Sequence, residues 1–441
     1  MDPHFHIGAA HFDPATGTAR FTYGLGEHRF TETLGFPSGF DASAAATPAF
    51  ERLLGLTGAV LGVSYFKLLA PLGISLDSPL SARERVFLLD VYENGLGEFY
   101  ARNDLRRFGR ITLTAPERTE TATPPPTLPD RALVPIGGGK DSLVSTQLLE
   151  RAGIPFTPFA VNPKGPILTS VAALERPPVY VTRTLDAEML RLSREPGYFN
   201  GHVPSTAINS MIAALTALLF GHNRIILSNE RSASEGNVQF DGREANHQHS
   251  KSLGFEQLIA EILSSATGGA LSYFSLLRPF SEARIAALFA RETRFDRVFS
   301  SCNRNFRLAG HEGPLWCGEC PKCHFVFLIF APAMAKDRLI GIFGKNLLAD
   351  PKTESSFREL TGLAGQKPWE CVGEIEEAAA CLYRLTQAPE WRNDAIVHAL
   401  AADLERQYGA PRLVSAYGAL FDDADAHLIP QELNQRLRHA L

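Results

Sequence analysis

The fold is decided by the stretch Ala132-Leu-Val-Pro-Ile136, followed directly by Gly137-Gly-Gly-Lys-Asp-Ser142. The apolar run predicts a short buried strand, and residues 142–152 carry apolar side chains at helical spacing up to Gly153. A strand that enters a helix through a glycine-rich turn presents several backbone N–H groups to one anion. The stretch therefore predicts an α/β fold with a nucleotide phosphate loop.

Each part of this loop has chemistry that suits a phosphate. The three glycines at 137–139 permit close backbone approach, and Lys140 adds a full charge to the partial charge of the helix N-terminus. Ser142 can donate its hydroxyl to a phosphate oxygen, and Asp141 can cap the helix or assist a metal ion. The spacing is neither a Walker A motif nor a Gly-x-Gly-x-x-Gly fingerprint. The alternative is a glycine-rich turn that only begins a helix.

Strands and helices alternate after the loop. Strands are predicted at 157–161, 179–183 and 224–228, with an apolar helix at 205–220. Such alternation predicts a parallel sheet covered on both faces. Because residues 131–350 also contain the phosphate loop, we expect them to form an ATP-binding catalytic domain. Residues 351–441 are predicted to be a helical C-terminal region, with amphipathic helices at 374–386, 393–408 and 430–441.

Residues 1–115 predict a smaller mixed α/β domain, which we relate to substrate. The pattern predicts strands at 21–24, 29–33 and 110–113 and helices at 48–70 and 80–94. Residues 116–130 are rich in proline, which prevents a helix or a central strand and favours an extended spacer. We therefore expect a linker there.

Composition excludes several classes of partner. The 441 residues are 45% hydrophobic and 21% charged, as in ordinary globular enzymes, and the net charge of −5 favours neither nucleic acid nor an anionic membrane. The first residues lack the basic and apolar regions of a secretory signal, and the longest apolar runs are too short or too polar to span a bilayer. A soluble cytoplasmic protein is expected, with its oligomeric state left open.

Four of the six cysteines are clustered. Cys302, Cys317, Cys320 and Cys323 include a Cys-x2-Cys-x2-Cys run, whose turns present several sulfurs to one ion. Four thiolates predict a closed structural zinc site, with His324 as a spare nitrogen ligand. Buried free cysteines, redox chemistry and an iron–sulfur cluster are the alternatives.

Polar stretches follow the strand predicted at 224–228. Ligands of parallel sheets bind beyond the carboxyl ends of the strands, so residues 229–237 are expected to border the nucleotide. Residues 241–251 are dense in groups suited to proton transfer, metal binding and anion contact, although a solvated loop is equally compatible with them. Residues 201–210 form a further polar segment, which precedes and begins the predicted apolar helix.

The loop resembles the Ser-Gly-Gly-x-Asp-Ser loop of the PP-loop ATP pyrophosphatases, with Gly137 in place of the usual serine. That superfamily cleaves ATP between its α and β phosphates. A four-cysteine cluster after such a loop also occurs in 7-cyano-7-deazaguanine synthase. The Pro-x-Arg-Asn segment of that enzyme is not matched here, because Pro204 is followed by Ser205 and Thr206.

Nearly the whole chain resembles one family. The matching runs are Val-Ser-Tyr-Phe-Lys (63–67), Asn-Gly-Leu-Gly-Glu-Phe (94–99), Ser-Asn-Glu-Arg-Ser-Ala-Ser (228–234) and Trp-Cys-Gly-Glu-Cys-Pro-Lys-Cys-His-Phe (316–325), besides the loop. The family is UDP-N-acetyl-α-D-muramoyl-L-alanyl-L-glutamate epimerase. The resemblance implies peptidoglycan synthesis in bacteria, with inversion of the terminal L-Glu of UDP-MurNAc-L-Ala-L-Glu and consumption of ATP and Mg²⁺. We expect a glutamyl-adenylate and release of AMP and pyrophosphate.

Candidate side chains for this chemistry come from the polar stretches. Glu230, His247 and His249 are the candidate proton-transfer groups, and Asn229 and Arg231 the candidate substrate-binding groups, since a guanidinium holds a carboxylate or a phosphate in bidentate fashion. Three other functions share the loop: ATP-dependent carboxylate amidation or nitrile formation, tRNA modification by a thiolase or lysidine-type ligase, and a non-catalytic nucleotide sensor. The near-neutral charge weighs against a nucleic-acid substrate.

Overall fold

The computed structural model describes residues 3–119, 123–234, 236, 238–306, 313–365, 368, 370 and 372–441. Within these residues a single eleven-stranded sheet runs through the molecule in the order β13-β10-β7-β8-β9-β4-β3-β1-β5-β6, with β2 paired to β3. Its strands are β1 (His4–Ile7), β2 (His11–Asp13), β3 (Thr18–Leu25), β4 (His28–Gly35), β5 (Gly73–Leu76), β6 (Thr112–Thr114), β7 (Ala132–Pro135), β8 (Phe156–Val161), β9 (Val179–Thr184), β10 (Arg224–Leu227) and β13 (Ser272–Ser275).

Two parts of the sheet differ in strand direction. The five strands from β13 to β9 are all parallel, as the alternation of strands and helices predicted. The antiparallel pairing of β4 with β9 joins this part to the strands of residues 1–115, so one sheet extends across the proline-rich segment. The molecule is thus an α/β protein built on one mostly parallel sheet.

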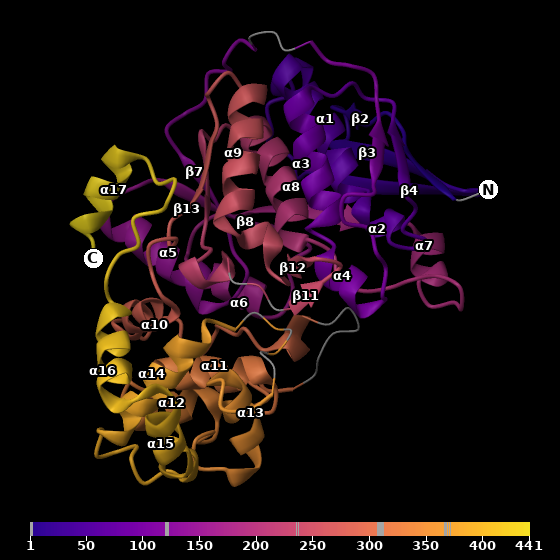
Figure 1. Ribbon diagram of the computed structural model, residues 1–441. Helices are drawn as coiled ribbons and strands as arrows, with labels where there is room; N and C mark the ends of the chain where they lie inside the picture. The colour runs from indigo at the N-terminus through magenta and orange to yellow at the C-terminus, as the bar shows by residue number, and fades with distance from the viewer. Residues whose placement is uncertain are drawn as a thin grey trace.

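Helices cover the sheet and form a separate C-terminal layer (Figure 1). Those before residue 300 are α1 (Pro48–Leu61), α2 (Val63–Phe66), α3 (Ala82–Glu93), α4 (Gly97–Arg102), α5 (Lys140–Arg151), α6 (Pro166–Ala172), α7 (Ala187–Leu192), α8 (Ser205–Phe220), α9 (Leu253–Ala266) and α10 (Glu282–Ala290). The later ones are α11 (Pro321–Phe330), α12 (Lys336–Phe343), α13 (Glu354–Leu360), α14 (Ile375–Thr386), α15 (Ala395–Tyr408), α16 (Ala410–Ala419) and α17 (Gln431–Arg438). A two-stranded ribbon, β11 (Val238–Phe240) with β12 (Arg243–Ala245), lies apart from the main sheet.

The predicted elements around the phosphate loop are confirmed, and two others are corrected. The helix expected at 48–70 is interrupted at Gly62, where an added Cβ would lie 2.7 Å from the Tyr92 hydroxyl, and continues as α2. The strand expected at 110–113 is β6, two residues later, because the Arg110 N–H is used in a turn with the Arg107 carbonyl.

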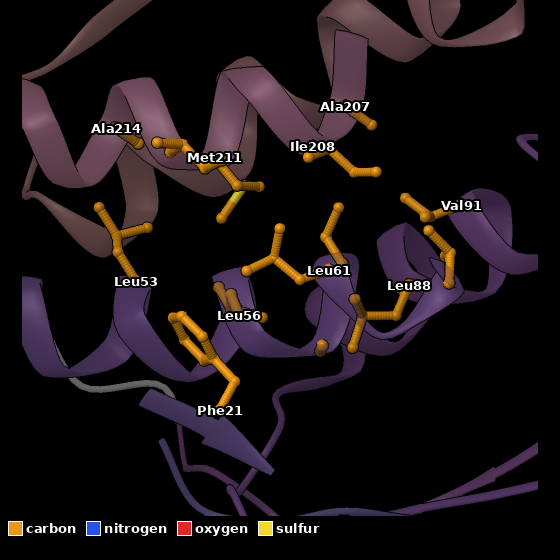
Figure 2. Close-up of a cluster of buried hydrophobic side chains, with 14 of the residues drawn as sticks. Phe21, Leu53, Leu56, Leu61, Leu88, Val91, Ala207, Ile208, Met211 and Ala214 are labelled. Atoms are coloured by element: carbon orange, nitrogen blue, oxygen red, sulfur yellow. The ribbon is translucent and has the colours of Figure 1, made fainter. Parts of the chain in front are cut away.

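The core joins the two parts of the sheet. In Figure 2, Leu53, Leu56 and Leu61 of α1 pack between Phe21 of β3 on one side and Met211 of α8 on the other, with Leu88 and Val91 of α3 beside them. Burial of such a side chain contributes roughly 1.5–3 kcal/mol, so this contact fixes α8 against the N-terminal elements. In the described part of the chain, no helix is long and apolar enough to cross a membrane.

Candidate functional site

The phosphate loop connects β7 to the N-terminus of α5. Gly138 has a φ of +80°, and a Cβ there would lie 2.9 Å from the Pro166 carbonyl carbon. A Cβ on Gly139 would lie 2.6 Å from the Ser301 hydroxyl, and the Ser300 N–H donates to the Gly138 carbonyl at 2.9 Å. Gly138 therefore requires glycine, because its positive φ and the Pro166 backbone leave no room for a side chain, and Ser301 packs against the neighbouring Gly139.

A pocket of about 440 Å³ opens in front of this loop. The carboxyl ends of β7 and β10 form its floor, as expected for a parallel sheet. The N-termini of α5 and α8 both face it, and neither helix has a side-chain cap on its first N–H groups. Its polar lining consists of Gly137, Gly139, Asp141, Ser142, Ser205, Thr206, Asn209, Ser210, Ser228, Asn229, Lys251, Ser300, Ser301, Asn303 and Lys322. Two helix N-termini and two lysines make this lining suitable for an anion.

The side chain of Lys140 makes different contacts from the phosphate contact that its position in the loop predicted. Its side chain is 1% exposed, and its ammonium contacts the carboxylates of Asp141 and Glu282. Burial alone lowers the pKa of Lys140, but the two carboxylates raise it above its ordinary value. Burial alone likewise raises the pKa of Asp141, whereas Lys140 and Lys322 bring it below its ordinary value. Lys140 is thus a charged buried anchor, and Lys251 and Lys322 are the cations on the pocket lining.

The four clustered cysteines are brought together as their spacing predicted. The Sγ atoms of Cys302, Cys317, Cys320 and Cys323 all lie within 4.8 Å of one another, and those of Cys317 and Cys320 lie 3.7 and 3.5 Å from that of Cys323. Tetrahedral zinc with Zn–S bonds of about 2.3 Å places its sulfurs about 3.8 Å apart. These residues therefore fit a four-sulfur metal site.

This cluster holds one wall of the pocket. Ser300, Ser301 and Asn303 flank Cys302, and Lys322 lies between Cys320 and Cys323 at the start of α11. The spare ligand His324 has another use, because its Nδ1 lies 2.7 Å from the Ser356 hydroxyl and its Nε2 3.3 Å from the Gly318 carbonyl. A metal bound here would fix the wall without reaching the pocket contents.

Of the candidate site residues that follow β10, one lines the pocket and two make contacts within the protein. Asn229 lines the pocket, as expected for a substrate-binding candidate. The buried Glu230 carboxylate accepts a hydrogen bond from the Ala233 N–H at 2.8 Å, which begins the short helical turn at Arg231–Ser234. Arg231 lies 3.9 Å from the Glu374 carboxylate. Glu230 and Arg231 are therefore already engaged in structural contacts.

The two candidate histidines lie against different partners. His249 Nε2 is 2.7 Å from the Asp90 carboxylate of α3. His247 Nδ1 makes a hydrogen bond with Glu98 of α4, and His202 Nδ1 lies 3.4 Å from the same carboxylate oxygen. The structure thus groups His247 with Glu98 and His202, and it separates His249 from them.

Several residues of the site carry no signal of their own in the sequence. Arg278, 2% exposed, donates to the Glu230 carbonyl, the Lys251 carbonyl and the Glu256 carboxylate, so one buried guanidinium holds two segments of the site. Glu98 and His202 stand in stretches singled out in the sequence, but their pairing depends on the tertiary fold. For Arg278 the only available signal was an arginine inside an otherwise apolar run, Leu276-Leu-Arg-Pro-Phe280.

The sheet and its pocket define an α/β protein whose polar, anion-compatible site lies at the carboxyl ends of parallel strands. The MurL N-terminal domain model matches residues 2–276, and the MurL C-terminal domain model matches residues 298–412. The chain therefore belongs to the MurL family.

Similar proteins cover most of its length. A protein of Micromonospora sp. is 42% identical over 397 residues, 88% of each chain, and one of Xanthomonas oryzae pv. oryzae is 39% identical over 431 residues, 97% of this chain and 95% of the relative. One of Salinispora tropica is 41% identical over 397 residues, 88% of this chain and 86% of the relative. All three are named UDP-N-acetyl-alpha-D-muramoyl-L-alanyl-L-glutamate epimerase.

Proposed function

We propose that this protein is an ATP- and Mg²⁺-dependent epimerase that inverts the terminal L-Glu of UDP-MurNAc-L-Ala-L-Glu to D-Glu in peptidoglycan precursor synthesis. The names of its relatives support the epimerase role. The single observation that supports the use of ATP is the pocket in front of the phosphate loop, where the positive φ and close packing of Gly138 leave no room for a side chain.

Activation of the carboxylate explains why an epimerisation would consume ATP. The α-hydrogen beside a carboxylate is barely acidic, because its removal adds a second negative charge to the same group. Attack of the carboxylate oxygen on the α phosphate gives a glutamyl-adenylate and releases pyrophosphate. The neutral acyl group then accepts the electron pair, and each pKa unit of acidity gained corresponds to about 1.4 kcal/mol. Hydrolysis finally releases AMP and the epimerised product.

In this proposal, we give each group of residues in the pocket lining a role. The backbone of 137–142 and the Ser142 hydroxyl hold the pyrophosphate portion of ATP, and Lys251 and Lys322 compensate its charge. Mg²⁺, when bound, supplies charge neutralisation between the phosphates, and Asp141 is the pocket carboxylate available to it. Zinc would be held by Cys302, Cys317, Cys320 and Cys323, and there it would keep this wall of the pocket in place.

Analysis of the nucleotide products tests the proposal. The protein is incubated with ATP, Mg²⁺ and either UDP-MurNAc-L-Ala-L-Glu or the same molecule with an L-Ala-L-isoglutamine end, in which an amide replaces the α-carboxylate, with and without ammonia. We expect AMP and pyrophosphate only with the glutamate substrate and without any need for ammonia. ADP and phosphate would refute activation at the α phosphate, and AMP formation that requires ammonia would identify an amidating enzyme.

A further inference from the structure

Three segments far apart in the sequence converge beside the pocket. Glu98 belongs to α4, His202 to the segment before α8, and His247 to the segment after β12. Glu98 Oε2 is hydrogen-bonded to His247 Nδ1 and lies 3.4 Å from His202 Nδ1, and the two imidazole rings have centroids 4.7 Å apart. We call Glu98, His202 and His247 the imidazole cluster.

The imidazole cluster is tightly built. Glu98 is 5% exposed, and its second oxygen accepts a hydrogen bond from Arg102 Nε at 2.6 Å. A Cβ on Gly95 would lie 2.4 Å from the Val91 carbonyl oxygen and 3.3 Å from Pro204 Cβ, so this glycine lets the segment before α8 approach α4. Close packing of this kind fixes the orientation of the imidazoles.

Electrostatics keep the imidazole cluster in a useful protonation state. Burial lowers the pKa of His202 to about 4, with further lowering by His247, Lys251 and Lys67 against the opposing effect of Glu98. Burial alone raises the pKa of Glu98, but its hydrogen bond with His247 and the charges of its neighbours bring it below its ordinary value. At neutral pH His202 is therefore a neutral imidazole beside a carboxylate, and only a neutral imidazole can accept a proton.

The imidazole cluster adjoins the pocket of the phosphate loop. Ser205, three residues after His202, lines that pocket, and so does Lys251. The charge of Lys251 acts on the pKa of both Asp141 and His202, so this lysine lies near both groups. A substrate that extends from the phosphate loop past Ser205 and Lys251 would reach the imidazoles.

We propose that His202 and His247, oriented by Glu98, form the proton-transfer centre that removes the α-hydrogen of the activated glutamate. The Nδ1 atoms of both rings face Glu98, so the proton passes to Nε2, and the electron pair of the C–H bond moves into the adenylate carbonyl. This inference rests on the proposed function.

The spacing of the rings places both imidazoles on one face of the substrate. Proton transfer brings the reacting heavy atoms to about 3–3.5 Å, so two bases on opposite faces of one carbon need nitrogens about 6 Å or more apart. The two imidazole rings have centroids only 4.7 Å apart, so no substrate carbon fits between them. The centre therefore removes the proton from one face, and water delivers a proton to the other face to complete the inversion. Glu98 is a positioning residue in this scheme.

Variants that separate activation from proton transfer test the proposal. His202→Gln and His247→Gln are compared with His398→Gln, an exposed histidine of α15, for substrate-dependent exchange of pyrophosphate into ATP and for exchange of the glutamate α-hydrogen in heavy water. We expect α-hydrogen exchange to fall about 100-fold or more in both cluster variants, with pyrophosphate exchange preserved. The control variant should retain both activities.

Each other outcome has a definite meaning. Preserved α-hydrogen exchange in either cluster variant would overturn the role of that histidine. Loss of pyrophosphate exchange in a variant with native thermal unfolding would assign the cluster to substrate binding instead. If the unmodified protein and the control variant bind one equivalent of metal that the cluster variants lack, the cluster is a metal site and the proton-transfer proposal is overturned. Absence of pyrophosphate exchange in the unmodified protein would refute the proposed function rather than this inference.

The positioning role of Glu98 has its own readout. Glu98→Gln should lower kcat with little change in KM, because the amide no longer stabilises an imidazolium on His247. Glu98→Asp, which keeps the charge, should restore part of kcat. Equal loss in both variants would contradict an electrostatic role for Glu98.

Discussion

Replacement of Lys140 by methionine tests whether this lysine supports the loop from within. Its ammonium lies between Glu282, 3% exposed, and Asp141, 32% exposed. Methionine keeps most of the side-chain volume but leaves Glu282 as a buried carboxylate without its cation. Breaking a buried pair in this way costs about 3–5 kcal/mol. Asp141 adds little to this figure, because solvent screens its partly exposed carboxylate.

A second substitution isolates the ion pair from other effects. In the Lys140→Met background, Glu282→Gln removes the uncompensated charge and should restore about 1–3 kcal/mol, a coupling measurable in a double-mutant cycle. The assay is urea unfolding followed by circular dichroism, with ATP binding measured by calorimetry on the same samples. Unchanged urea stability in Lys140→Met, together with loss of ATP binding, would refute the buried anchor and return Lys140 to the phosphates.

The remaining predictions concern metal, support and pH. The Cys317→Ser variant should lose its bound metal and bind ATP more weakly, and full metal content in this variant would refute the metal site. An absorption spectrum of the unmodified protein distinguishes colourless zinc from an iron–sulfur cluster. Arg278→Met should destabilise the fold by about 3–5 kcal/mol, since it leaves Glu256 buried and unpaired, and calorimetry showing no change would refute this. Burial lowers the pKa of His222 to about 3, so the unfolded state takes up its proton first. As the pH is lowered from about 6.5, His222 should therefore reduce the free energy of unfolding by up to about 1.4 kcal/mol per pH unit. The decrease should be smaller in His222→Phe, and equal pH slopes in the two proteins would contradict this.

Local patterns explain why the centre of the fold was predictable. The strand, three glycines and helix from 132 to 152 follow one another without a gap, so β7 and α5 were predicted almost to their ends. The same holds for the cysteine cluster, because three of its members lie within seven residues. The short strand β13 (Ser272–Ser275) gave too little periodicity to be predicted.

Contacts between distant segments explain what could not be predicted. The pairing of β4 with β9 joins residues about 150 positions apart, and no sequence pattern near either strand predicts this pairing. The burial of Lys140 depends on Glu282, and the grouping of His247 with Glu98 and His202 depends on close packing at Gly95. The sequence therefore indicated which polar stretches border the site, but not which of their side chains lie together.

The most direct test of the central claim is ATP-dependent exchange of the substrate α-hydrogen. The protein is incubated with UDP-MurNAc-L-Ala-L-Glu and Mg²⁺ in heavy water, with ATP or with a non-hydrolysable analogue blocked between the α and β phosphates. We expect deuterium at the glutamate α-carbon, and D-Glu in the hydrolysed product, only in the sample that contains ATP. Epimerisation with the blocked analogue, or without any nucleotide, would contradict activation of the carboxylate as an adenylate.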